Sequence, residues 1–164
     1  MEIYTSFIKS PIGWMELTGN ESGISSLIFI EENKKNIFEI HDSLKNVAYQ
    51  IEEYFSGKRK IFELKLNPEG TDFQKKVWRE LAEIPFGKTV SYLTIAIALG
   101  DKNATRAVGN ANGKNPISII VPCHRVIGEN GKLTGYAGGL WRKEWLLQHE
   151  KKGSLGEQKQ LFNL

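Results

Sequence analysis

Cysteine, histidine and long apolar runs are scarce in this sequence of 164 residues, which has one cysteine and three histidines. A single cysteine forms no internal disulfide, which fits the reducing cytosol, and we expect a cytoplasmic protein. Scattered histidines without a pair of cysteines argue against a structural zinc site. Apolar runs such as "ISIIV" are too short to span a bilayer, and the N-terminus lacks the apolar core of a signal peptide. The sequence therefore predicts no metal, no cofactor and no membrane contact.

The composition is that of a folded protein, and the charge is unevenly distributed. Hydrophobic residues make up 40% of the chain and charged residues 25%, which argues against intrinsic disorder. Residues 1–68 have 8 Lys and Arg against 10 Asp and Glu, a net charge of −2, whereas residues 69–164 have 14 against 9, a net charge of +5. This asymmetry indicates that the second half faces something anionic, with nucleic acid as one candidate.

The first part of the chain has the pattern of a small sheet with one helix. Three short apolar runs predict strands at 3–8, 13–18 and 24–30. A helix is expected between Asp42 and Gly57, where glycine ends it. The run "KRKIFELKL" predicts a further strand, and the breaker-rich loop after it marks a domain boundary near 67–70. We expect an N-terminal domain over 1–68.

The second part opens with the signals of three helices. Thr71 and Gln74 have the spacing of a capping box and begin the first helix. Ser91 can cap the second helix, "YLTIAIALG", which Gly100 ends. The stretch "ATRAVGNANGKN" predicts a short third helix. Two helices joined by a short turn suggest a helix-turn-helix unit.

The remainder of the chain predicts a strand, a hairpin and a closing helix. "ISIIV" has the pattern of a buried strand that runs into Pro122. A hairpin is expected to turn at Asn130-Gly131, ahead of a glycine-rich loop. "LWRKEWLLQHE" predicts the closing helix. We expect the second domain to cover 69–152 and the segment 153–164 to be a frayed tail.

The only cysteine lies in "VPCHRVIG" and poses the main functional question. Proline cannot donate to a strand ladder, so Pro122 would leave Cys123 at a loop-like edge that a ligand can reach. His124 and Arg125 supply a candidate base and a positive charge that favours thiolate. Neighbours on an extended chain point to opposite faces, so a water or a bend would have to join His124 to the sulfur. These residues alone leave open whether Cys123 is a nucleophile or a buried, inert side chain.

Two other features also have two interpretations each, and two tyrosines have one each. The helix "ATRAVGNANG" has Arg106 as its single long side chain, so it either presses into a DNA minor groove or packs tightly in the core. Glu150 lies at a helix C-terminus, where the dipole disfavours an acid, so it is either solvated or paired with a cation such as a histidine. Tyr92 fits a core position, whereas glycines around Tyr136 suggest a backbone that passes close to a ligand.

Several motifs in the second half resemble one family. "NPISIIVPCHRVIG", "GYAGG" and "KEWLLQHE" closely resemble motifs of the O6-alkylguanine-DNA alkyltransferases, and "FGKTVSY" and "ATRAVGNANGKNP" match in the same order. The resemblance implies an α+β fold, in which a small N-terminal ribonuclease-H-like sheet-plus-helix domain precedes a winged-helix-like C-terminal domain with a helix-turn-helix. It also implies DNA repair by irreversible transfer of the alkyl group of O6-alkylguanine in duplex DNA to the protein's own cysteine, once per chain.

The resemblance implies roles for five residues in the reaction. Cys123 would accept the alkyl group, and His124 would take the thiol proton through a water. Glu150 would orient and charge-stabilise that histidine. Asn115 would brace the active-site segment by hydrogen bonds, and Tyr92 would donate its hydroxyl proton towards the departing purine.

The resemblance further implies how the substrate is held. Tyr136 would wall the base pocket, and backbone groups near Val126 and Ala137 would read the guanine edges. The nucleotide has to leave the stack to be reached, and Arg106 would fill its place. The other DNA-binding positions of the same helix are Thr105, Ala107 and Gly109. The expected partner is double-stranded DNA containing O6-alkylguanine, bound by a monomer.

Departures from the family pattern affect the metal and the substrate range. Some members hold an N-terminal zinc with cysteines that this chain lacks. Ala137 stands where others have serine, as in bacterial-type members that tolerate bulkier alkyl groups and O4-alkylthymine. Two alternatives remain: a cysteine hydrolase that uses Cys123 and His124, which predicts turnover, and a non-enzymatic lesion-binding protein, which predicts an unchanged mass.

Overall fold

The computed structural model describes the backbone of residues 2–33 and 35–162 and, within these ranges, the side chains up to residue 155. The chain divides into two compact units, which we describe separately: Met1–Gly70 with Pro116–Ile120, and Thr71–Asn115 with Val121–Leu164. In the described part of the chain, every helix is too short or too polar to cross a membrane. The same residues contain no group of three or more His, Cys, Asp or Glu side chains that could hold a metal ion.

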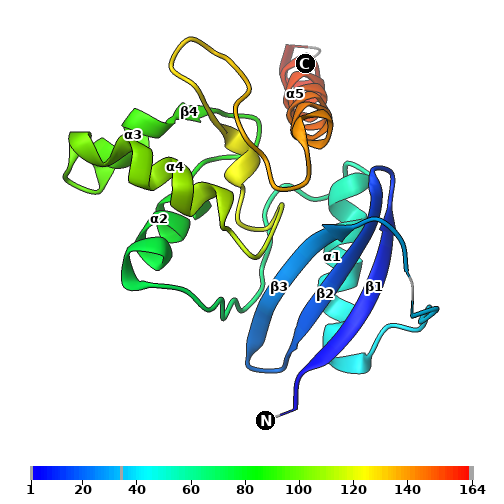
Figure 1. Ribbon diagram of the computed structural model, residues 1–164. Coiled ribbons are helices and arrows are strands. Elements are labelled where there is room, and N and C mark those ends of the chain that lie inside the picture. The colour runs from blue at the N-terminus through cyan, green and yellow to red at the C-terminus, as the bar shows by residue number, and fades with distance from the viewer. Residues whose placement is uncertain (1, 34, 163–164) are drawn as a thin grey trace. The chain divides into compact units, whose positions relative to one another are not determined.

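The first unit is built on a three-stranded antiparallel sheet (Figure 1). Its strands confirm the three predicted ones and are β1 (Tyr4–Ser10), β2 (Gly13–Asn20) and β3 (Gly23–Ile30). Leu17 lies opposite Leu27 across β2 and β3, and both side chains are fully buried. Figure 1 shows the first helix lying along one face of the sheet, so these apolar residues lie in the core of the unit.

The predicted helix of the first unit is present, with a short 3-10 turn at its start. The turn η1 (Asp42–Leu44) leads into α1 (Lys45–Phe55). The cap is His41, whose Nδ1 accepts a hydrogen bond from the N–H of Ser43 at 3.1 Å. Gly57 ends the helix in the left-handed region, at a φ of 82°, as the sequence predicted. The buried residues of α1 share one face and are Val47, Gln50, Ile51 and Tyr54.

The further strand predicted from "KRKIFELKL" is wrong, because only one residue of that run joins the sheet. Leu66 forms an isolated parallel bridge with Ile24 on the edge of β3. Farther along β3, Leu27 bonds to the segment 116–118: its N–H donates at 2.8 Å and its carbonyl accepts at 2.9 Å. Two segments distant in sequence therefore share this edge, and each forms a single bridge with β3.

The second unit contains the predicted helices. They are α2 (Asp72–Ala82), α3 (Tyr92–Ala98), the 3-10 turn η2 (Lys102–Ala104) and α4 (Thr105–Gly113). The capping box is present, because Thr71 Oγ1 accepts the N–H of Gln74 at 3.1 Å and Gln74 Oε1 accepts the N–H of Thr71 at 2.9 Å. Trp78 is buried on α2 and donates its indole N–H to the carbonyl of Ala111 at 2.9 Å, which ties α2 to α4. The helix-turn-helix order α3–η2–α4 matches the prediction.

The buried strand predicted for "ISIIV" is also wrong beyond its first residue. Ile117 forms one bridge with β3, after which the chain turns. Ile119 has a φ of 71°, a left-handed conformation that is rare for a β-branched residue. The N–H of Ile120 donates to the carbonyl of Ser118, two residues back, at 2.8 Å. All five residues of the run are buried, which accounts for its mainly apolar composition. Strand pairing does not account for it, because only Ile117 forms a bridge.

The predicted hairpin forms a turn without flanking antiparallel strands. The two-residue strand β5 (Val126–Ile127) pairs in parallel with β4 (Val90–Ser91). The N–H of Gly131 donates to the carbonyl of Gly128 at 2.9 Å, which closes the expected turn. Residues 132–139, all described, contain no strand. Glycines interrupt this segment, and strand interiors disfavour glycine.

The closing helix is longer than predicted. Helix α5 (Leu140–Phe162) continues through most of the segment 153–164, for which we predicted a frayed tail, and residues 163–164 lie outside the described part. Gly153 packs against the ring of Phe86, where an added Cβ would lie 3.1 Å from Cε1. This contact lets a residue of low helix propensity continue the helix.

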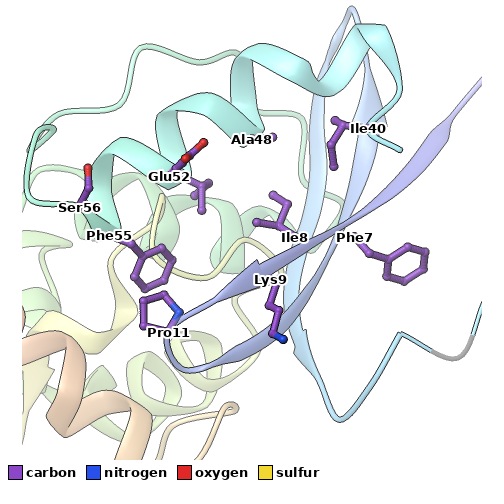
Figure 2. Close-up of a pocket in the computed structure, with 10 residues that line it drawn as sticks. Phe7, Ile8, Lys9, Pro11, Ile40, Ala48, Glu52, Phe55 and Ser56 are labelled. Carbon is purple, nitrogen blue, oxygen red and sulfur yellow. The ribbon is translucent and has the colours of Figure 1, made fainter. Parts of the chain in front are cut away.

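A pocket of about 460 Å³ opens between β1 and α1 in the first unit (Figure 2). Its lining is mainly apolar, with Ile8 and Phe55 among the labelled residues and Lys9 and Glu52 as the charged ones. All of its lining residues belong to the first unit, and none of the predicted site residues is among them.

Replacing Gly87 should destabilise the protein more than replacing Gly57, although both have a φ near +80°. Each alanine carries left-handed strain of about 1–2 kcal/mol. At Gly87 the added Cβ would also overlap the Ser154 hydroxyl and lie 3.2 Å from its Cβ, whereas nothing lies within 4 Å at Gly57. We expect Gly87→Ala to lose about 1 kcal/mol more than Gly57→Ala in urea unfolding. Equal losses would contradict this packing.

Candidate active site

The cysteine follows a tight turn in the second unit. Cys123 begins the 3-10 turn η3 (Cys123–Arg125). Its N–H donates to the carbonyl of Val121 at 2.8 Å across Pro122, whose φ of −83° and ψ of 63° are those of an inverse γ-turn. The side-chain amide of Asn115 donates to the same carbonyl at 2.8 Å. Asn115 therefore bonds to the same turn that sets the backbone direction at Cys123.

The thiol is less accessible than the sequence suggested. We expected Pro122 to leave Cys123 at an open edge, but the residue is only 5% exposed. Burial raises the pKa of the Cys123 thiol, while a hydrogen bond from Asn115 and the charge of Lys143 act in the opposite direction. A buried thiol in neutral form is a poor nucleophile, so its reactivity depends on the groups around it.

His124 is paired with the acid at the far end of the sequence motif. Its Nε2 lies 2.7 Å from Oε2 of Glu150, and both residues are almost completely buried. Of the two sequence interpretations of Glu150, pairing with a histidine is therefore the correct one. Because the carboxylate accepts from Nε2–H, the lone pair of His124 is on Nδ1. That Nδ1 is buried and has no hydrogen-bond partner among the described residues.

Arg125 occupies a different place from the one we expected. The sequence suggested that its charge would favour the thiolate, but its guanidinium lies against Glu150. Nε donates to Oε1 at 2.8 Å, Nη2 to Oε2 at 3.1 Å, and Nη1 to the carbonyl of Ile84 at 2.7 Å. The backbone N–H of Gly87 adds a further bond to Oε1 at 3.2 Å. Arg125 is buried, so this is an internal ion pair with bidentate geometry.

This arrangement fixes the charge states of Glu150 and His124. Burial works against the charged carboxylate, but the bonds from His124 and Arg125 outweigh it and hold the pKa of Glu150 well below its ordinary range. Burial lowers the pKa of His124, and its bond to Glu150 does not reverse this. His124 is therefore neutral near pH 7, and Glu150 orients the ring without making it cationic. A neutral, oriented imidazole can act as a general base, and His124 directly follows Cys123 in the chain.

Tyr92 lies in a second hydrogen-bonded group of the same unit. Its hydroxyl accepts from Thr134 Oγ1 at 2.9 Å, which leaves its own proton available for donation. The Nζ of Lys143 donates to the carbonyl of Thr134 at 2.6 Å and to that of Gly135 at 3.4 Å. Lys143 is fully buried and was missed in the sequence. Its spacing from Leu146 and Glu150, on one face of a helix, was the available signal.

The three residues expected to hold the base differ in how far they are exposed to solvent. Val126 is fully buried in β5, next to η3. Tyr136 is half-buried, and its carbonyl accepts from the N–H of Gly139 at 2.9 Å. Ala137 is exposed. These three follow the cysteine within the same unit.

Helix α4 has one packed face and one exposed face, so core packing accounts for only part of it. Its buried residues are Val108, Ala111 and Asn112. Arg106 and Ala107 are exposed, and Thr105 is half-buried. Gly109 lies against the ring of Tyr92, with an added Cβ 3.8 Å from Cδ1. Asn112, also missed in the sequence, donates from Nδ2 to the carbonyl of Cys123 at 3.5 Å.

Two family models match the chain. One, described as the ribonuclease-like domain of 6-O-methylguanine DNA methyltransferase, matches residues 3–68. The other, described as the DNA binding domain of 6-O-methylguanine DNA methyltransferase, matches residues 72–152.

Relatives and solved structures are similar over nearly the whole chain. The methylated-DNA–protein-cysteine methyltransferase of Methanosarcina barkeri is 52% identical over 154 residues, which are 91% of this chain and 98% of that protein. The crystal structure of Mycobacterium tuberculosis O6-methylguanine methyltransferase has 44% identity and a TM-score of 0.82, over 92% of this chain and 94% of that one. A crystal structure of a Mycobacterium tuberculosis relative in complex with DNA has 46% identity and a TM-score of 0.82, over 90% and 92%.

Breaking the buried ion pair should be strongly destabilising. Glu150→Gln leaves the Arg125 guanidinium buried without a counter-charge, for which we expect a loss of about 3–5 kcal/mol in urea unfolding. Arg125→Met should also destabilise, and the double variant should recover much of the loss because no uncompensated charge remains. Lys45→Met, which breaks an exposed pair with Asp42, is the control and should leave the midpoint unchanged. Additive losses in the double variant would contradict a shared pair.

Proposed function

Since the chain belongs to the 6-O-methylguanine DNA methyltransferase family, we propose that Cys123 is the residue to which it transfers the methyl group of O6-methylguanine in DNA. The observation that carries the proposal is that the chain has one cysteine and that this cysteine precedes a buried, oriented histidine. A thioether at Cys123 would not be reversed, so each chain acts once. The protein would work as a monomer in the cytoplasm.

The proposed reaction begins with the thiol proton. His124 Nδ1 takes this proton through a water, and the Cys123 thiolate attacks the methyl carbon. The new S–C bond forms as the C–O6 bond breaks, and the electron pair passes to the guanine. Tyr92 donates its hydroxyl proton to the purine ring, so guanine leaves as a neutral base. The bond from Thr134 to the Tyr92 oxygen supports this role, because it leaves the tyrosine proton free and disperses charge on the oxygen.

The base would be held by the segment that follows Cys123. Tyr136 would form one wall, and backbone groups near Val126 and Ala137 would recognise the guanine edges. Ala137 is exposed and has no hydroxyl, which supports a pocket that also admits larger alkyl groups and O4-alkylthymine.

DNA would approach the exposed face of α4. Thr105, Arg106, Ala107 and Gly109 would contact the minor groove, since small side chains let the helix backbone come close. Arg106 is the long exposed side chain of this group and would fill the place of the flipped nucleotide. The net charge of +5 over residues 69–164 supports phosphate contacts that depend on salt and little on sequence.

Intact mass should identify the acceptor. After incubation with a duplex containing O6-methylguanine, the protein should gain the mass of one methyl group in place of one hydrogen, localised to Cys123 by peptide mapping. Cys123→Ala should gain nothing. Release of free methyl product over many cycles would instead support a cysteine hydrolase, and tight binding at constant mass would support a lesion-binding protein.

The variant Arg106→Ala should separate the flipping of the nucleotide out of the duplex from the methyl-transfer step itself. Repair of the duplex should slow by about tenfold or more, because unstacking a base costs a few kcal/mol without the intercalated side chain. Transfer from the free O6-methylguanine base should change little, since no stack has to be opened. Single-turnover rates on both substrates measure this. Equal losses would remove Arg106 from the proposed role.

A further inference from the structure

One cation inside the second unit has no counter-charge. Lys143 is 0% exposed, and its Nζ donates to two carbonyls, those of Thr134 and Gly135. No ion pair within the described side chains includes it. Burial lowers the pKa of Lys143 to about 8, and the charge of Cys123 works in the other direction. At pH 7 the side chain is an ammonium held among neutral groups, an arrangement that lowers stability unless something compensates.

The other charges around Cys123 are already accounted for. Arg125 and Glu150 neutralise each other through their bidentate contact. His124 is neutral, because burial lowers its pKa. Lys143 is left as the positive group: helix α5, to which it belongs, packs against the turn η3 that contains Cys123, and its charge, like the hydrogen bond from Asn115, works against the rise that burial causes in the pKa of the thiol. An ammonium near a buried sulfur favours thiolate over thiol.

The same ammonium also fixes the segment that leads to Tyr136. It binds the carbonyls of Thr134 and Gly135, which are otherwise exposed residues in a stretch without secondary structure. Thr134 in turn holds the hydroxyl of Tyr92 at 2.9 Å. Lys143 therefore holds the segment that leads to Tyr136 and, through Thr134, the hydroxyl of Tyr92.

We propose that Lys143 is a positioning residue of the methyl transfer: its ammonium favours the thiolate of Cys123 and fixes the 134–135 backbone, which aligns Tyr92 and Tyr136. The use of that thiolate for methyl transfer rests on the proposed function. The effect on the sulfur does not, and it can be measured without DNA.

The test is the pH dependence of Cys123 alkylation by iodoacetamide in the full chain. Lys143→Met removes the charge and the donors, and Lys143→Gln removes the charge but keeps N–H donors for the carbonyls. We expect both to react about tenfold more slowly at pH 7, with a midpoint at higher pH, because an opposite charge near a thiol shifts its titration by about one unit or more. Lys143→Arg should restore the wild-type midpoint.

Lys151→Met is the matched control, since it removes an exposed lysine of the same helix. It should alkylate like the wild type at every pH. Near-UV circular dichroism establishes that each variant is folded, and Lys143→Gln serves if Lys143→Met is not. A folded Lys143→Gln with the wild-type midpoint would overturn the proposal.

Methyl-transfer rates on duplex substrate separate this inference from the proposed function. Slower transfer in Lys143→Gln, together with the shifted alkylation midpoint, supports the proposal. If the wild type transfers a methyl group and the midpoints do not differ, the Lys143 proposal is wrong and the proposed function stands. If the wild type transfers nothing while the midpoints differ, the proposed function is wrong and only the effect on the sulfur remains.

Discussion

The second unit depends on one buried carboxylate. Glu150 accepts hydrogen bonds from Arg125, His124 and the backbone of Gly87, so it joins α5 to η3 and to the loop before β4. Because Arg125 neutralises its charge, the carboxylate can orient His124 while the imidazole stays neutral. A solvated acid would do neither. The same bonds thus stabilise the fold and determine which nitrogen of His124 is free to take a proton.

The parts of the fold that depend on local sequence could be predicted. The caps at Thr71 and Ser91 involve neighbours three residues away, and both were correct. The strands expected at 58–66 and in "ISIIV" were wrong because their pairing depends on one edge of β3, which two distant segments share. The extension of α5 past Gly153 was missed because glycine has low helix propensity, and propensity does not reveal that this glycine packs against the ring of Phe86.

The pairing of Glu150 was anticipated from a premise that is wrong. The sequence placed this acid at a helix C-terminus, whereas α5 continues to Phe162. The pairing with His124 is nevertheless present, and the cation beside the carboxylate is Arg125. Arg125 was misplaced because the alternation of an extended chain does not apply to the 3-10 turn that contains it. Lys143 was missed because a lysine in a charged helix ordinarily lies at the surface, and only its spacing from Glu150 distinguishes it.

The pairing of the segment 116–118 with Leu27 also determines when, during synthesis, the sheet of the first unit can be completed. The first unit includes Pro116–Ile120, so its sheet edge is completed only when those residues leave the ribosome, after α2, α3 and α4 have been made. Until then the edge of β3 at Leu27 has exposed backbone groups, which can pair with other chains. A fragment that ends at Gly70 would keep this open edge permanently. Once it has been made, the segment just before Cys123 therefore covers backbone groups of β3 that other chains could otherwise pair with.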